Sequence, residues 1–151
     1  MTGWRLGWLS GPESVVNAAK KLHPATTTCA SSVSQQAGIA ALTGPQEPFE
    51  EMGAAFEERR DYVVDRVEEI PEISCPTPEG GFYAFVNVEA LDGTSYDVAE
   101  RLLEEQGVVT VPGAGFGAGG EGHLRVSFAT SLERLEVGFD RIEAFVDDDL
   151  A

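Results

Sequence analysis

The chain has 151 residues, enough for one domain or for a small domain with part of another. Aspartate and glutamate together number 26 against 10 lysines and arginines, so the formal net charge is −16 at pH 7. This balance argues against nucleic acid and anionic membrane as partners, because both bind positively charged surfaces.

The acidic residues are spread over several segments, and lysine is nearly absent. We expect a cytoplasmic protein of a halophile, in which salt screens the repulsion between carboxylates. An ordinary acidic protein remains the alternative. The two cysteines and two histidines show no metal-ligand spacing, so no metal site is expected. The sequence has no run of about 18 apolar residues, so no membrane span is expected either.

The first half of the chain predicts one strand and three helices. The strand covers residues 3–9, where large apolar side chains flank Arg5. Apolar residues at helical spacing then predict helices over about 12–23, about 33–43 and about 49–69. Prolines and glycines in 71–80 make the best internal boundary.

The second half predicts the order β-α-β-β-α. Strands are expected at 82–88, 107–111 and 124–128, with a Gly-rich loop over 112–122. Thr94 is expected to cap the first helix, and Thr130 with Glu133 forms a capping-box pattern before the last one. Two helices can cover one face of a small sheet, so the fold class is α/β, with an α+β small domain.

The opening stretch places Met1, Gly3, Arg5, Leu6 and Gly7 in a characteristic spacing. It resembles the second half of the lysine-attachment motif of the class I and II aminotransferases. These are enzymes of fold type I that use pyridoxal 5′-phosphate (PLP). The resemblance implies that the PLP lysine lies four residues before Met1 and that Arg5 binds the PLP phosphate. The alternatives are an ordinary edge strand and a structural ion pair for Arg5.

The Gly-rich loop fits the pattern G-x-G-x-x-G through Gly115, Gly117 and Gly120. A dinucleotide site of this kind must open a helix, whereas this loop leads into a predicted strand, so nucleotide binding is not expected. The run "VVTVPGAGFG" instead resembles the Pro-Gly-x-x-Phe-Gly segment that lies near the substrate in the aminotransferases.

Arg125 is the second candidate site residue. Strand alternation places Leu124, Val126 and Phe128 on one face and Arg125 on the other. A guanidinium can hold a carboxylate through two parallel hydrogen bonds, although an arginine here can also be a solvated surface residue. The run "LRVSFA" resembles the segment whose arginine binds the α-carboxylate of the substrate in this family.

The remaining candidates are weaker. In "PTPEGGFYAF", which resembles the start of the family's small domain, Phe82 either approaches the substrate side chain or belongs to the core. Ser31, Ser32 and Gln35 lie where the family's chain crosses toward the partner subunit, and a solvent-exposed helix start explains them equally well. Packing roles are expected for the other candidates, namely His23, Cys29, Cys75 and Tyr83.

The resemblance implies that residues 1–48 are a remnant of a large PLP-binding domain, 49–70 a connecting helix and 71–151 the small domain. The parent protein would be a homodimeric aminotransferase acting on an amino acid and a 2-oxo acid. Neither Lys20 nor Lys21 precedes Arg5, so this chain alone is expected to be inactive. A stand-alone small-molecule-binding module and a partner for a separately encoded N-terminal half remain the alternatives.

Overall fold

The computed structural model describes residues 1–150 and divides into two compact units. The first unit is Met1–Glu50, and the second begins at Glu51. The helix α3 (Glu47–Glu69) runs across the division and belongs mainly to the second unit. The three-part division at residues 48 and 70 stays a prediction.

The first unit is helical. It contains a 3-10 helix, η1 (Thr2–Trp4), followed by α1 (Glu13–Thr26) and α2 (Ser32–Thr43). The strand predicted over 3–9 is therefore wrong. A strand needs a neighbour for its backbone groups, and residues 1–50 contain none. The hydroxyl of Ser34 instead donates to the Trp4 carbonyl at 2.9 Å.

The apolar side chains of the first unit remain largely exposed. Only Ser34 and Gly38 are buried on its helices α1 and α2. Trp8 is 77% exposed, and Leu22, Val33 and Leu42 are each more than 60% exposed. Within residues 1–50, the described side chains thus form no hydrophobic core of their own.

The second unit contains a three-stranded antiparallel sheet with the order β1-β3-β2. Its elements follow α3 as β1 (Tyr83–Asn87), α4 (Ser95–Gln106), β2 (Val111–Pro112), β3 (His123–Ser127) and α5 (Leu132–Asp149). The predicted order β-α-β-β-α is confirmed, and so is the mixed α+β class. The second strand is shorter than predicted and begins only at Val111.

Local signals explain where the helices of this unit begin and end. Thr94 caps α4 in a capping box with Asp97, and Gly107 ends the helix with φ 67°. The capping box predicted for Thr130 and Glu133 is wrong. Ser131 is the N-cap of α5, because it is the last residue with extended dihedral angles before the helix.

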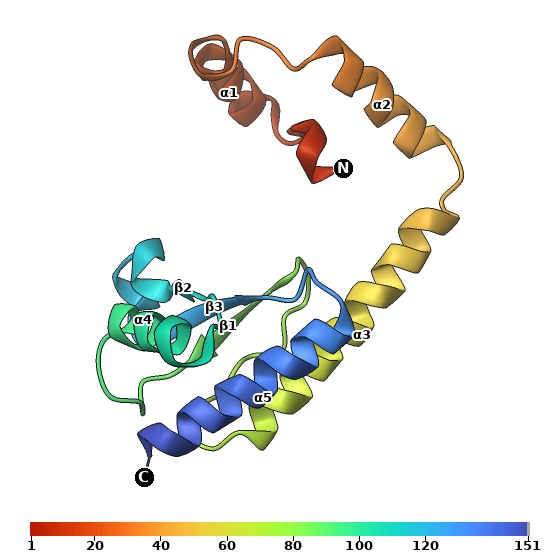
Figure 1. Ribbon diagram of the computed structural model, residues 1–151. Coiled ribbons are helices and arrows are strands. Elements are labelled where there is room, and N and C mark those ends of the chain that lie inside the picture. The colour runs from red at the N-terminus through yellow and green to blue at the C-terminus, as the bar shows by residue number, and fades with distance from the viewer. Residues whose placement is uncertain (151) are drawn as a thin grey trace. The chain divides into compact units, whose positions relative to one another are not determined.

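The hydrophobic core lies on one face of the sheet. Ala84, Val86 and Leu124 point from the strands toward side chains of α4 and α5, which include Leu102 and Phe145. The C-terminal part of α3 and α5 lie side by side (Figure 1). Two ion pairs join these helices. The Nη2 atom of Arg66 on α3 lies 2.8 Å from Glu143 and 3.2 Å from Asp140, and both carboxylates are on α5.

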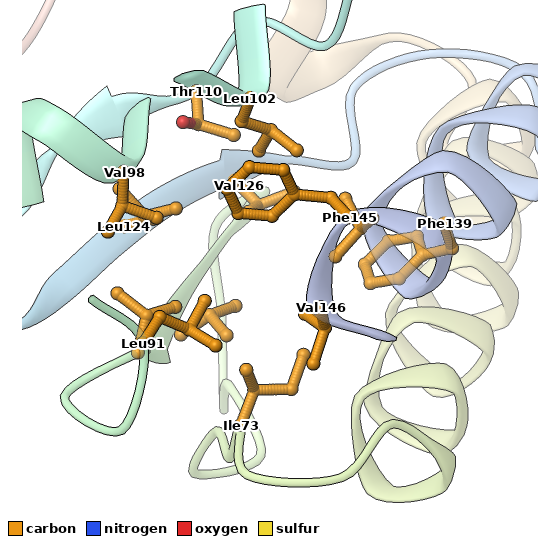
Figure 2. A pocket seen from close by; sticks show the side chains of 13 residues that line it. Ile73, Leu91, Val98, Leu102, Thr110, Leu124, Val126, Phe139, Phe145 and Val146 are labelled. Atoms are coloured by element: carbon orange, nitrogen blue, oxygen red, sulfur yellow. The ribbon is translucent and has the colours of Figure 1, made fainter. Parts of the chain in front are cut away.

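This core encloses a small cavity, shown in Figure 2. The volume that the centre of a water molecule could occupy in it is about 20 Å³. Apolar side chains of the sheet, α4 and α5 line the cavity. Thr110 is the single polar residue in the lining. Its hydroxyl oxygen is buried and has no hydrogen-bond partner among the described residues.

We expect Thr110→Val to stabilise the protein. Valine has nearly the same shape and removes a buried hydroxyl that lacks a partner, which is worth about 1 kcal/mol. Thr110→Ser is the matched control, because it keeps the hydroxyl and loses a methyl group, and it should destabilise by about 1 kcal/mol. Urea unfolding followed by circular dichroism measures both. A valine variant that unfolds more easily than the original chain would contradict the prediction.

Asp149 fastens the end of α5 to the rest of the second unit. Its carboxylate accepts the backbone N–H of Asp92 at 3.0 Å and pairs with Arg101, and its side chain is only 5% exposed. The N–H of Asp92 and then the guanidinium of Arg101 hold the pKa of Asp149 below its usual value.

We therefore expect Asp149→Asn to destabilise the protein by about 1 kcal/mol at pH 7. A lowered pKa in the folded state stabilises above the unfolded pKa, and this contribution is lost as the pH falls through the folded pKa. The difference between the two proteins should thus shrink below about pH 4. Unfolding curves at pH 7, 5 and 3 measure it, and an unchanged difference across these values would refute the assignment.

Candidate functional site

Strand β3 places Arg125 on the face of the sheet that points away from the hydrophobic core, which we call the open face. Leu124 is buried in the core with 4% exposure, and Val126 packs against the same core. Arg125 lies between them in sequence and points to the opposite side, where Phe85 of β1 is its register partner. The alternation predicted for this strand is confirmed.

Two aromatic rings contact the guanidinium of Arg125. Its carbon Cζ lies 4.3 Å from the ring centre of Tyr83 and 4.7 Å from that of Phe116. Both contacts have cation–π geometry. Aromatic rings accept no strong hydrogen bond, so they leave the N–H edge of the guanidinium for other partners.

That edge has hydrogen-bonding capacity left over. The Nε atom of Arg125 is buried without a partner, and no carboxylate within residues 1–150 forms an ion pair with this arginine. A buried donor without a partner is costly. A carboxylate fits, because its two oxygens can accept two parallel N–H bonds from one guanidinium edge.

The Gly-rich loop brings Phe116 to this site. It forms two 3-10 helices, η2 (Gly113–Phe116) and η3 (Ala118–Gly120), and then enters β3. Gly113 and Gly120 approach so closely that a side-chain carbon on either would overlap the carbonyl oxygen of the other. The loop leads into β3 and opens no α-helix, as the sequence predicts.

Glu121 joins this loop to the first turn of α4. One carboxylate oxygen accepts the backbone N–H of Ser95 at 2.7 Å, and the other accepts the Ser95 hydroxyl at 3.2 Å. The backbone N–H groups of Ser95 and then Gly122 hold the pKa of Glu121 below its usual value. The Ser95 oxygen also accepts the Ala114 N–H of η2 at 3.4 Å.

The aromatic residues in and just before β1 divide between the two faces. Phe82 packs against the core, with its ring centre 6.1 Å from that of Phe56. Tyr83, for which a packing role was predicted, is 40% exposed and lies against Arg125. His123 stacks on Phe85 at 5.0 Å on the same face as Arg125.

The sequence interpretation missed Tyr83 and Glu121 as parts of the site. Alternation in β1 could have found Tyr83, because it shares a face with Phe85. The resemblance places the segment that contains Phe116 near the substrate, although it does not predict the contact with Arg125. No sequence signal places Glu121, since its contacts depend on how the loop folds.

In the first unit, Arg5 is exposed and adopts a left-handed backbone with φ 51°. Its Nη1 donates weakly to the Thr2 carbonyl at 3.4 Å. No ion pair to Arg5 occurs among residues 1–150, so the alternative of a structural ion pair finds no support in the described part of the chain. Its guanidinium is available to an anion.

The other candidates of the first unit are surface residues. Ser31 precedes α2 as its N-cap without a side-chain hydrogen bond, Ser32 begins the helix, and Gln35 donates to the Ala30 carbonyl at 3.0 Å. His23 and Cys29 are exposed, so the packing roles predicted for them are wrong. In the second unit, Cys75 does pack against the core, and burial raises the pKa of its thiol.

Residues 1–150 contain no group of histidine, cysteine and acidic side chains placed to hold a metal ion. In the same range no helix combines the length and the apolar character needed to cross a membrane.

The second unit is a small α+β domain in which Arg125 contacts Tyr83 and Phe116 and has a buried Nε without a partner. The family described as aminotransferase class I and II matches residues 1–142. The chain is 42% identical to an aspartate aminotransferase of Geobacillus stearothermophilus over 97% of its own length and 38% of the relative's.

Solved structures agree with this match. An alanine aminotransferase of Pyrococcus furiosus aligns with 97% of the chain at a TM-score of 0.85 and 37% identity, and the chain covers 39% of it. An aromatic aminotransferase of Pyrococcus horikoshii aligns with 98% at 0.86 and 34% identity, with 40% of it covered. The chain therefore belongs to the class I and II aminotransferases, and it spans about two fifths of the length of these relatives.

We expect Arg125→Lys to weaken the binding of maleate, a planar dicarboxylate probe, by about tenfold, because lysine cannot form the bidentate contact. Arg134→Lys is the matched control, since Arg134 is exposed on α5. Titration followed by the backbone N–H resonances of β1 and β3 measures the affinity in both variants. Equal maleate affinity in the two variants would show that Arg125 does not hold the carboxylate.

Proposed function

We propose that this chain is the C-terminal part of an aminotransferase that moves an amino group between an amino acid and a 2-oxo acid. The observation that carries the proposal is the enclosed guanidinium of Arg125, in a chain that belongs to this family. Its N–H edge binds the α-carboxylate of the substrate and fixes the orientation of the substrate.

Enzymes of this family use PLP, which supplies an electron sink for bonds broken at the substrate α-carbon. Arg5 is the residue of this chain that would hold the phosphate. Its exposed guanidinium, free of any carboxylate within residues 1–150, fits a dianionic group. Covalent attachment needs a lysine before Arg5, whereas Lys20 and Lys21 lie after it on α1.

The rings of Tyr83 and Phe116 contact the guanidinium and displace water where they touch it. This strengthens the electrostatic attraction between Arg125 and a carboxylate. A direct role for Phe82 at the substrate side chain is the weaker part of the proposal, because its ring packs toward Phe56. The names of the relatives mention aspartate, alanine and aromatic aminotransferases, so no substrate side chain is assigned.

We further propose that the complete protein is a cytoplasmic homodimer adapted to high salt. The net charge of −16 supports salt dependence, because screening reduces repulsion between carboxylates. The exposed apolar side chains of the first unit support burial against further protein, either additional chain or a second subunit.

A stand-alone carboxylate-binding module without catalysis is the second candidate. The observation in its favour is that the second unit has its own core and contains all the residues around Arg125. The two candidates differ in whether additional upstream sequence creates activity.

We expect the 151-residue chain to show no transamination and no visible absorbance from bound PLP. A longer protein, in which the preceding part of the Geobacillus stearothermophilus relative is fused before Met1, should show both. The control is the same fusion with the PLP lysine changed to alanine. Spectra and coupled assays with aspartate, alanine and phenylalanine measure the result. Transamination by the 151-residue chain alone would refute the proposal.

A further inference from the structure

We propose that Glu121 is a positioning residue, which holds Phe116 against the Arg125 guanidinium by fastening the Gly-rich loop to the first turn of α4. The consequence for substrate affinity rests on the proposed carboxylate site at Arg125. The structural part of the inference does not.

The first step concerns the attachment itself. The Glu121 carboxylate uses both oxygens on one residue, accepting the N–H of Ser95 and its hydroxyl hydrogen. Ser95 is 1% exposed, so these bonds are shielded from water on that side. The N–H belongs to the first turn of α4, where helix donors lack partners within the helix and a negative charge is favourable.

The second step concerns the loop between the two attachment points. The Ser95 oxygen, which donates its hydrogen to Glu121, accepts the N–H of Ala114 at 3.4 Å. Ala114 lies near the start of the loop, and Glu121 follows its end. Ser95 therefore forms hydrogen bonds with residues at both ends of the loop. The close contact between Gly113 and Gly120 also joins the two ends.

The third step concerns Phe116. Its side chain is 56% exposed, so the hydrophobic core does not fix its position. Its ring centre lies 4.7 Å from Cζ of Arg125 and 6.4 Å from the ring centre of Phe85, and the two rings are nearly perpendicular. The attachment of the loop to α4 must therefore determine where this ring lies. Without it, Phe116 can leave Arg125, and water can reach that face of the guanidinium.

Glutamine is not equivalent to glutamate at this position. Its amide has one oxygen, which can accept the Ser95 N–H, but its NH₂ group must donate to the Ser95 oxygen. The serine hydrogen then loses its acceptor, and the amide becomes a second donor to the serine oxygen, which already accepts the N–H of Ala114. Glu121→Gln should thus weaken the link to the loop with little change in side-chain size.

The experiment uses the 151-residue chain labelled with ¹⁵N and follows the Nε–H resonance of Arg125, which ring currents from Phe116 shift. Maleate is the carboxylate probe. The variants are Glu121→Gln, Glu121→Ala, Phe116→Ala and the pair Glu121→Ala with Phe116→Ala. Asp149→Asn is the matched control, because it also removes a carboxylate that accepts a backbone N–H, at the far end of α5. Circular dichroism shows which variants are folded.

We expect Glu121→Ala and Phe116→Ala to move the Arg125 resonance in the same direction and to weaken maleate binding about fivefold, the scale of one cation–π contact. Glu121→Gln should fall between Glu121→Ala and the original chain. The double variant should bind no more weakly than Phe116→Ala, since both changes act through one contact. Asp149→Asn should leave the resonance and the affinity unchanged.

A folded Glu121→Ala variant with an unmoved Arg125 resonance would overturn the inference, as would an equal effect of Asp149→Asn. If Glu121→Ala fails to fold, the exposed Phe116→Ala and the milder Glu121→Gln decide the same question. If the original chain does not bind maleate, the proposed carboxylate site fails. The shift of the resonance in Glu121→Ala then still decides the positioning role.

Discussion

The pairing of β1 with β3 is the constraint on which both the core and the site depend. In this antiparallel register Val86 faces Leu124, and Phe85 faces Arg125. The first pair points into the core, and the second pair lies on the open face. A shift of one residue would exchange the faces of every side chain in β3. It would place the guanidinium among apolar side chains, so burial of Leu124 indirectly keeps Arg125 at the site.

The contacts of Arg125 on the open face of the sheet support the proposal that it binds a carboxylate. Tyr83 and Phe116 hold the guanidinium without neutralising it, because aromatic rings attract a cation but accept no strong hydrogen bond at its edge. A carboxylate partner within the protein would compete with a substrate for the same N–H groups. An arginine fixed by rings therefore loses less side-chain freedom on binding and keeps its donors available, as expected of a preorganised site.

Local patterns in the sequence predicted most of the second unit. Thr94 caps α4 as expected, and alternation placed Arg125 on the correct face. The strand predicted over 3–9 does not form, since apolar residues favour a strand only where another strand is present to pair with. Thr130 carries the capping pattern, but the dihedral angles of Ser131 decide where α5 begins.

The parts of the site that the sequence did not reveal depend on long-range contacts. Glu121 meets Ser95 across 26 positions, and neither residue forms a recognisable motif with the other. In the sequence, Glu121 is one of 26 acidic residues, and composition alone favours a solvated surface role for each. What distinguishes it is a buried N–H group at the start of α4 that lies within reach of its carboxylate.

The two units of the chain differ in how many of their large apolar side chains are buried. The second unit buries Phe128, Phe139 and Phe145 almost completely and carries every side chain that encloses Arg125. The first unit exposes Trp4 and Trp8 and buries no large apolar residue. Apolar side chains stabilise a fold only when they leave water. The geometry around Arg125 can therefore be maintained within the second unit, whereas the first unit leaves Arg5 exposed.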